Sequence, residues 1–171
     1  MGPPACRFLF FVDTSRAMAK SVPAIASTVG SLIASGGQGR MRAGDAFAVW
    51  HLSDEPFQFE VPIQIWTPDD AVIQAERTAT FLRNREYTKR ARAETAFREM
   101  FLAMKNSESL TTFLISNGEI AMLGTPFDLD INKAYLQGGP VARKEHKPLV
   151  TMLRAENRLV VDWAEIGRAH V

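Results

Sequence analysis

The sequence predicts an α/β domain built on a mostly parallel sheet, and three observations indicate it. Short apolar runs of strand length alternate with longer segments whose apolar residues recur at helical spacing, which is the pattern of successive βαβ units. Several of these runs are apolar throughout, as strands buried on both faces of a parallel sheet are. Polar loops follow two of the runs directly, and sites form at such positions. The 171 residues favour a single domain.

The apolar runs place six strands. The first stops at the polar group Asp13-Thr14-Ser15, and the turn Ala43-Gly44-Asp45 precedes the second. Pro62 lies in the third run, where its missing N–H restricts the strand to an edge or hairpin position. We expect the strands at residues 7–12, 46–52, 57–66, 110–116, 149–153 and 159–163.

Four segments have the spacing of helices. Pro23 falls inside the first, so that helix should begin late or bend there, and Gly36-Gly37 should end it. The run Gly138-Gly139-Pro140 should interrupt the last helix. We expect the helices at residues 17–34, 68–84, 94–105 and 130–145.

Composition and charge argue against several classes of partner. Lys and Arg number 20 against 19 Asp and Glu, which gives no general attraction to nucleic acid or to an anionic membrane. We therefore expect no nucleic-acid partner, and we interpret the basic stretch from Arg83 to Arg98 as a solvated surface. We also expect no membrane segment, because no apolar run approaches the roughly 20 residues of a membrane helix. The single cysteine, Cys6, cannot form an internal disulfide and leaves the compartment open between cytoplasmic and periplasmic or secreted.

The last residues of the chain have a distinct character. The segment Ile166-Gly167-Arg168-Ala169-His170-Val171 corresponds to the translation of a common short-read sequencing adapter. We therefore expect a C-terminally truncated domain over residues 1–164, and we interpret residues 165–171 as read-through, to be excluded from fold reasoning.

Two polar loops follow strands of the predicted sheet, at residues 13–17 and 116–119. The carboxyl ends of neighbouring parallel strands share one rim of a sheet. If the two strands are neighbours, these loops converge there and form a candidate site.

The segments that carry the loops resemble the von Willebrand factor type A family. Phe8 to Met18 resembles the family's opening strand and metal-site loop, Arg42 to Asp54 its second strand, and Leu114 to Glu119 its fourth strand and following loop. An uncharacterised bacterial subgroup is similar in further segments, at residues 124–128 (Gly-Thr-Pro-Phe-Asp) and 147–151 (Lys-Pro-x-Val-Thr). The resemblance implies a three-layer fold, with helices on both faces of the central sheet. It also implies a Mg²⁺ at the rim that binds a carboxylate of the partner.

Carried over residue by residue, the family's metal-ion-dependent adhesion site is degenerate in this chain. Asp13 and Ser15 match metal ligands, but Ala17 replaces the second serine and Asn117 replaces an aspartate. The threonine of the family falls on Ala93, and a match to Thr88 or Thr95 requires a shift. Mg²⁺ takes about six hard oxygen ligands, and loss of a carboxylate beside it removes an attraction on the order of several kcal/mol. We expect weak or absent metal binding at Asp13 and Ser15, and no other cofactor.

The resemblance therefore indicates a non-enzymatic protein-binding or scaffold module with a degraded metal site. Arg16 is a candidate to bind an anionic partner in place of the metal. Alternatively, Asp13 and Ser15 act only as caps that accept hydrogen bonds from free backbone N–H groups. The loops at residues 13–17, 87–94 and 117–123 should face the partner, with candidate binding residues Asp13, Ser15, Arg16, Ala17, Asn117 and Glu119.

An enzymatic alternative is a phosphohydrolase of the haloacid dehalogenase type, with Asp13 as the nucleophile. That family also has a later strand ending in Ser-Asn, as Ser116-Asn117 does. It requires a second aspartate two residues after the first, however, and Ser15 stands at that position. A third possibility is an inactive fragment with an exposed sheet edge.

Overall fold

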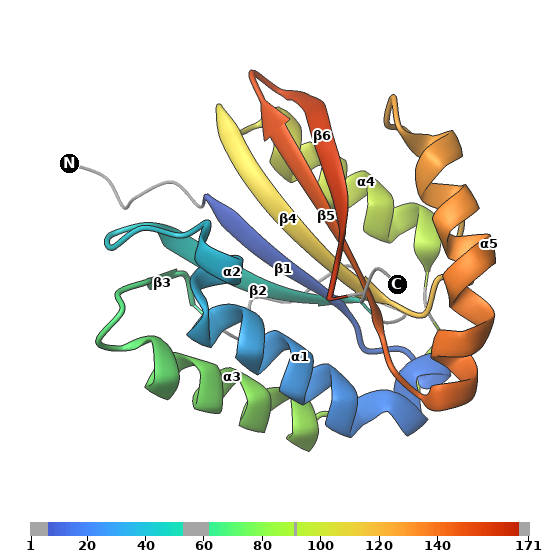
Figure 1. Cartoon of the computed structure of the whole chain (residues 1–171), viewed down its shortest axis with the longest axis horizontal. Coiled ribbons are helices and arrows are strands. Elements are labelled where there is room, and N and C mark those ends of the chain that lie inside the picture. Colours follow the sequence, from blue (N-terminus) through green and yellow to red (C-terminus); the bar gives the residue numbers. More distant parts are fainter. Residues whose placement is uncertain (1–6, 53–61, 91, 168–171) are drawn as a thin grey trace.

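The computed structural model describes residues 7–52, 62–90 and 92–167. A six-stranded sheet runs through it in the order β3-β2-β1-β4-β5-β6, with helices packed against it (Figure 1). The strands are β1 (Phe8–Asp13), β2 (Ala46–Leu52), β3 (Gln64–Ile65), β4 (Ser109–Ser116), β5 (Leu149–Glu156) and β6 (Leu159–Ile166). The helices are the 3₁₀ helix η1 (Arg16–Ser21), α1 (Val22–Ala34), α2 (Gly36–Gly39), α3 (Ala71–Asn84), α4 (Ala93–Lys105) and α5 (Asp128–Glu145).

The sheet is mixed, and the prediction of a mostly parallel sheet is not confirmed, since only some of the strands pair in parallel. Strand β1 pairs in parallel with β2 and β4, whereas the pairs β2–β3, β4–β5 and β5–β6 are antiparallel. Besides the short β3, the departure arises after β4, where α5 runs back toward the end of that strand (Figure 1). Strand β5 then begins with Leu149 opposite Ser116. A helix that joins two parallel strands ends at the opposite rim instead.

Two hydrophobic cores lie on opposite faces of the central strands. Successive residues of a strand point to opposite faces, and β1 is buried along its whole length. Phe10 and Val12 pack with residues of α1 and α3 in one core, whereas Leu9 and Phe11 pack with residues of α4 and α5 in the other. The predicted α/β class is thereby confirmed, with helices on both faces of these strands (Figure 1).

The first predicted helix begins as the 3₁₀ turn η1 and becomes the α-helix α1 at Val22. Pro23 lies in the first turn of α1, where its missing N–H has no partner to lose and its fixed φ suits the helix. This confirms the expected late start. Helices α3 and α4 cover most of the spans predicted for them.

Helix α5 continues without a break from Asp128 to Glu145, with Pro140 inside it. The predicted interruption at residues 138–140 is therefore wrong. A proline inside a helix removes one backbone hydrogen bond and is unfavourable, but the preceding Gly138 and Gly139 are buried. We infer that the packing of this part of α5 against the rest of the molecule offsets the local cost.

Two predicted boundaries differ from those in the structure. Of the third predicted strand, residues 57–61 lie outside the described part, and β3 retains only Gln64 and Ile65, paired with β2. At the other end, the predicted domain boundary after residue 164 falls inside β6, where Glu165 and Ile166 pair with β5. The origin of residues 165–171 stays a prediction.

The segment Arg16–Ala34 is long and apolar enough, by length and composition, to cross a membrane. Buried helices in protein cores meet the same criterion. Ile25, Val29 and Ile33 of this segment are fully buried in the core on the α1 face of the sheet, so we interpret the segment as a core helix. The expectation of no membrane segment stays a prediction.

Candidate functional site

The loop after β1 is closed by its own aspartate. Asp13 is the last residue of β1 and only 3 % exposed, and its Oδ1 accepts a hydrogen bond from the N–H of Ser15 at 2.8 Å. This confirms the expected capping role of Asp13. Ser15 precedes η1 but makes no capping bond with its side chain, so the same expectation for Ser15 is wrong. Its hydroxyl is buried and has no hydrogen-bond partner among the described residues.

Burial is the main influence on the Asp13 carboxyl and raises its pKa above the ordinary 3.8, because the charged form loses its hydration. The Ser15 hydroxyl and N–H oppose this shift, and the negative charge of Glu119 adds to it. The hydroxyl lies near the carboxyl, although the two side chains do not reach hydrogen-bond geometry. The folded protein therefore holds the Asp13 proton more tightly than an exposed aspartate would.

The loop after β4 has the same local architecture. The N–H of Glu119 donates to Oδ1 of Asn117 at 3.0 Å, which again closes a turn from residue i to residue i+2. Gly118 lies between them at a φ of +75°, and a Cβ there would approach Cδ1 of Leu149 to 2.7 Å. Glycine is the residue that fits both the positive φ and the contact.

The two loops meet at one rim, as the sequence predicts. Their strands β1 and β4 are parallel neighbours, and the loops line a common cavity of about 390 Å³. This confirms the expected convergence. The cavity is lined by Asp13, Ser15, Arg16, Ala17, Arg90, Asn117, Glu119 and Ile120.

A third loop, between α3 and α4, reaches the same rim. The N–H of Arg16 donates to the carbonyl oxygen of Lys89 at 2.6 Å. Tyr87 is buried and its hydroxyl donates to the carbonyl oxygen of Leu82 at 2.8 Å. Burial raises the pKa of Tyr87 to about 12, with Arg85 acting in the opposite direction and Asp13 adding a little. This loop includes the predicted partner-facing residues from 87 onward, and Thr88 is exposed in it.

The donor set at the cavity is incomplete for Mg²⁺. Ala17 offers no side-chain oxygen, and one oxygen each of Asp13 and Asn117 already accepts a backbone hydrogen bond. Two guanidinium-bearing residues, Arg16 and Arg90, line the same cavity. Among the described residues, no group of three or more His, Cys, Asp and Glu side chains is placed to hold a metal ion. Mg²⁺ takes about six oxygens, several of them usually from water, and among the described residues that line the cavity only Asp13, Ser15, Asn117 and Glu119 offer side-chain oxygens.

A second hollow of about 340 Å³ adjoins the first and was not predicted. The two share Arg16, Ala17, Asn117 and Glu119, and the second adds basic residues from η1 and from the end of α5. The signal in the sequence was the basic end of the last predicted helix. A mostly parallel sheet would have placed that end at the other rim. The additional lining residues are Ala19, Lys20, Ser21, Arg143, His146 and Lys147.

Arg143 connects α5 to the loop after β4. Its Nη1 donates to the carbonyl oxygen of Asn117 at 3.0 Å, and its Nε lies 3.6 Å from Oε1 of Glu119. The Arg143 side chain is one-third exposed. The loop that carries Asn117 is therefore held from both sides, by its own turn and by the guanidinium group.

No protein-family model, curated protein or solved structure matches the chain. The resemblance to the type A family consequently stays a prediction. The chemistry of the rim is the basis on which a function can be assigned.

Proposed function

We propose that this chain is a non-enzymatic binding module of the von Willebrand factor type A kind, in the family's three-layer arrangement, with a degenerate metal site. In this proposal the rim binds an anionic group of a protein partner through Arg16. The observation that carries the proposal is the lining of the first cavity. Arg16 and Arg90 line it beside Asp13 and Asn117, where the resemblance places a metal ion.

A guanidinium can replace a bound cation as the positive group that binds a carboxylate. Arginine presents two parallel N–H groups to a carboxylate and keeps its charge at all physiological pH values. The Arg16 side chain is exposed, while its backbone is anchored to Lys89.

Arg16 and Arg90 also repel a divalent cation, and Ala17 and Asn117 weaken its ligand set. We therefore expect no saturable heat when Mg²⁺ is titrated into the protein in a calorimeter, and no change in its thermal midpoint with added Mg²⁺. A stoichiometric Mg²⁺ isotherm that disappears in the Asp13→Asn variant would contradict this part of the proposal.

The same residues favour binding over phosphohydrolysis. A nucleophilic aspartate must be accessible to its substrate, whereas Asp13 is only 3 % exposed and its Oδ1 accepts the Ser15 N–H. Ser15 occupies the position of the second aspartate that the hydrolase mechanism needs. We expect p-nitrophenyl phosphate to be hydrolysed no faster by the wild-type protein than by Asp13→Asn, with or without Mg²⁺.

The decisive test is a nuclear magnetic resonance titration with a capped pentapeptide that carries one glutamate between glycines. The amide signals of residues 15–17 and 117–119 should move on addition of this peptide, and much less with the glutamine version. Arg16→Glu should weaken binding roughly fivefold or more, since an exposed charge pair contributes up to about 1 kcal/mol.

Lys105→Glu is the matched control for this test. Lys105 is an exposed residue at the end of α4, close in the chain to the start of β4 and therefore at the opposite rim. The control should leave binding unchanged. An affinity that is equal in wild-type and Arg16→Glu proteins would overturn the proposed function.

A further inference from the structure

Because β5 runs antiparallel to β4, the basic C-terminal end of α5 lies at the same rim as the loop after β4. Because Leu149 pairs with Ser116, the helix that precedes β5 has to end where β4 ends. Helix α5 therefore ends at Glu145 beside the loop after β4, and Arg143, His146 and Lys147 line the second hollow. In a parallel arrangement these residues would lie at the far rim.

Positive charge is concentrated along the two adjoining hollows. Their lining contains five Lys and Arg residues and two acidic residues. With His146 neutral, these residues carry a net charge of +3, compared with +1 for the whole chain counted in the same way. The cations are Arg16, Lys20, Arg90, Arg143 and Lys147.

The position of Arg143 depends on a glycine one turn earlier in α5. A Cβ added at Gly139 would lie 2.7 Å from Nη1 and 3.4 Å from Cζ of Arg143. With hydrogen at that position, the guanidinium folds over its own helix and reaches the carbonyl oxygen of Asn117. Gly139 therefore permits a preorganised guanidinium between the helix and the loop.

We propose that the two hollows together bind an acidic segment of a protein partner, with one carboxylate at Arg16 and another at Arg143. This inference rests on the proposed function and names the chemistry of the partner. A guanidinium already held by Asn117 loses less side-chain entropy on binding a carboxylate than a free one does. Lys20 and Lys147 add long-range attraction along the same groove.

A peptide suits the groove better than a single-stranded nucleic acid does. Proteins that bind single strands combine basic residues with aromatic side chains on which bases stack. No Phe, Tyr or Trp is among the described residues that line the two hollows. The lining offers charge and hydrogen bonding without a stacking surface.

A structural explanation of the same basic residues is that they balance the dipole at the end of α5. The two explanations predict different measurements. A dipole role requires that Arg143→Gln lowers the thermal midpoint and leaves ligand binding unchanged. A binding role requires a loss of affinity that Gly139→Ala reproduces, since that change keeps the charge but moves the guanidinium.

The test uses a fluorescein-labelled octapeptide of alternating glutamate and serine, followed by fluorescence anisotropy at low ionic strength. Arg143→Gln, Gly139→Ala and Arg16→Gln should each weaken binding roughly fivefold. Lys133→Gln removes an exposed cation nearer the start of α5 and should change affinity less than twofold. Thermal melts confirm that each variant folds. Arg143→Lys serves as a second variant, because it keeps the positive charge but lacks the paired N–H groups of a guanidinium.

The outcomes separate this inference from the proposed function. Dependence on Arg16 without dependence on Arg143 or Gly139 overturns the two-hollow groove and leaves the proposed function standing. Absence of binding to both the octapeptide and the single-glutamate peptide overturns both. Tighter binding of an eight-residue oligothymidylate than of the octapeptide overturns the proposal that the groove binds a peptide.

Discussion

The two halves of the sheet differ in how completely they are covered. Strands β1, β2 and β4 form a parallel half, in which every residue of β1 is buried and β4 is buried from Leu110 to Ile115. Strands β5 and β6 form an antiparallel hairpin, and β6 is exposed or half-buried until its last residue, Ile166. Strand β5 still contributes Val150, Met152, Leu153 and Ala155 to the two cores, so the hairpin adds core residues as well as a partly solvated margin along β6.

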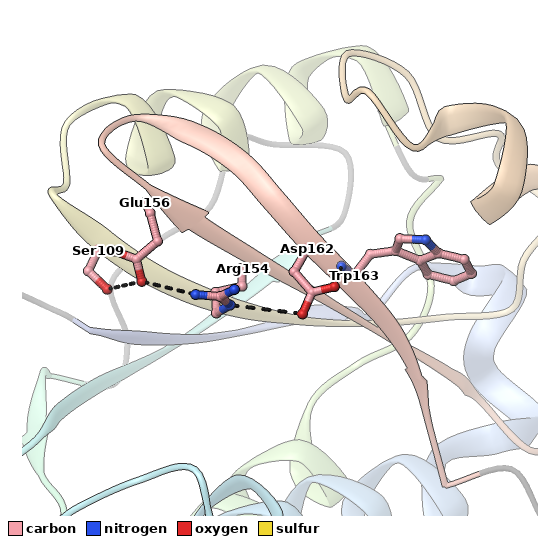
Figure 2. A network of polar contacts seen from close by, with 5 residues as sticks. All are labelled: Ser109, Arg154, Glu156, Asp162 and Trp163. Carbon is pink, nitrogen blue, oxygen red and sulfur yellow. Dashed lines mark hydrogen bonds and ion pairs between the residues drawn. The ribbon is translucent and has the colours of Figure 1, made fainter.

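The solvated margin carries polar contacts where the parallel half carries aromatic ones. Figure 2 shows Ser109, Glu156, Arg154 and Asp162 in a row across β4, β5 and β6. The Ser109 hydroxyl donates to Oε1 of Glu156 at 3.2 Å, and Arg154 lies 3.4 Å from Glu156 and 4.0 Å from Asp162. In the parallel half, Phe10 instead stacks on Phe113 at 5.2 Å.

The candidate groove lies at the seam between these halves. Strand β4 is parallel to β1 and antiparallel to β5. The rim therefore receives the carboxyl ends of β1 and β4 together with the helix end that precedes β5. The parallel half thus supplies Asp13 and Asn117 to the groove, whereas the change of strand direction supplies Arg143 and Lys147.

The largest predicted contrast between the halves is in core stability. Phe10 is 0 % exposed and contacts Phe47 and Phe113, so Phe10→Ala should lower the free energy of unfolding by about 3–5 kcal/mol. Leu159 of β6 is 69 % exposed, and Leu159→Ala should cost less than about 0.5 kcal/mol. Urea denaturation measures both losses. Similar losses in the two variants would contradict the difference in stability between the parallel half and β6.

A smaller effect should appear where α5 is attached to the hairpin. The hydroxyls of Tyr135 and Thr151 are buried and hydrogen-bonded at 2.6 Å. Tyr135→Phe leaves the Thr151 hydroxyl without this partner and should lower the free energy of unfolding by about 1–3 kcal/mol. The double variant Tyr135→Phe, Thr151→Val should recover part of that loss. A double variant as unstable as the sum of both single changes would show that the hydroxyl pair is not the cause.

The buried carboxyl of Asp13 at the end of β1 should make the free energy of unfolding depend on pH. Burial raises the pKa of Asp13 above 3.8, so the folded protein holds this proton more tightly than the unfolded chain does. Its contribution to stability is complete below pH 3.8 and is lost as the pH rises through the folded-state pKa. Relative to the wild type, Asp13→Asn should therefore gain free energy of unfolding as the pH rises through this window.

This prediction is checked by urea denaturation at a series of pH values. Titration of the Asp13 carboxyl carbon by nuclear magnetic resonance gives the folded-state pKa independently. A difference between variant and wild type that does not change with pH, or a carboxyl that titrates at or below 3.8, would contradict it.

The smallest effect is expected in the exposed ion pair of the hairpin. The side chains of Arg154 and Asp162 are 44 % and 56 % exposed, so solvent screens their attraction. Asp162→Asn should lower the free energy of unfolding by about 0.2–1 kcal/mol, and 1 M salt should remove the difference. A larger effect that persists in high salt would mean that the margin is more strongly coupled to the core than its exposure indicates.

Local residue patterns were sufficient to predict much of the parallel half. A run such as Phe8 to Val12 can only be buried on both faces, and a polar residue that follows it directly has to lie at the rim. That the Asp13 and Asn117 loops meet also required their two strands to be neighbours in the sheet, which the apolar pattern left open and the structure shows. The capping by Asp13 was also predictable, since an aspartate commonly accepts from a backbone N–H two residues later.

Tertiary structure alone decided the direction of β5 and everything that depends on it. The apolar pattern of a strand is the same whether it runs parallel or antiparallel to its neighbour, so the sequence of residues 149–156 did not fix its direction. Likewise, Gly138-Gly139-Pro140 signals a break by local propensity, whereas packing of α5 keeps the helix intact. The sequence by itself determined which residues end the central strands. The path of the chain after β4, set by packing energy summed over distant residues, determined that Arg143 and Lys147 join them.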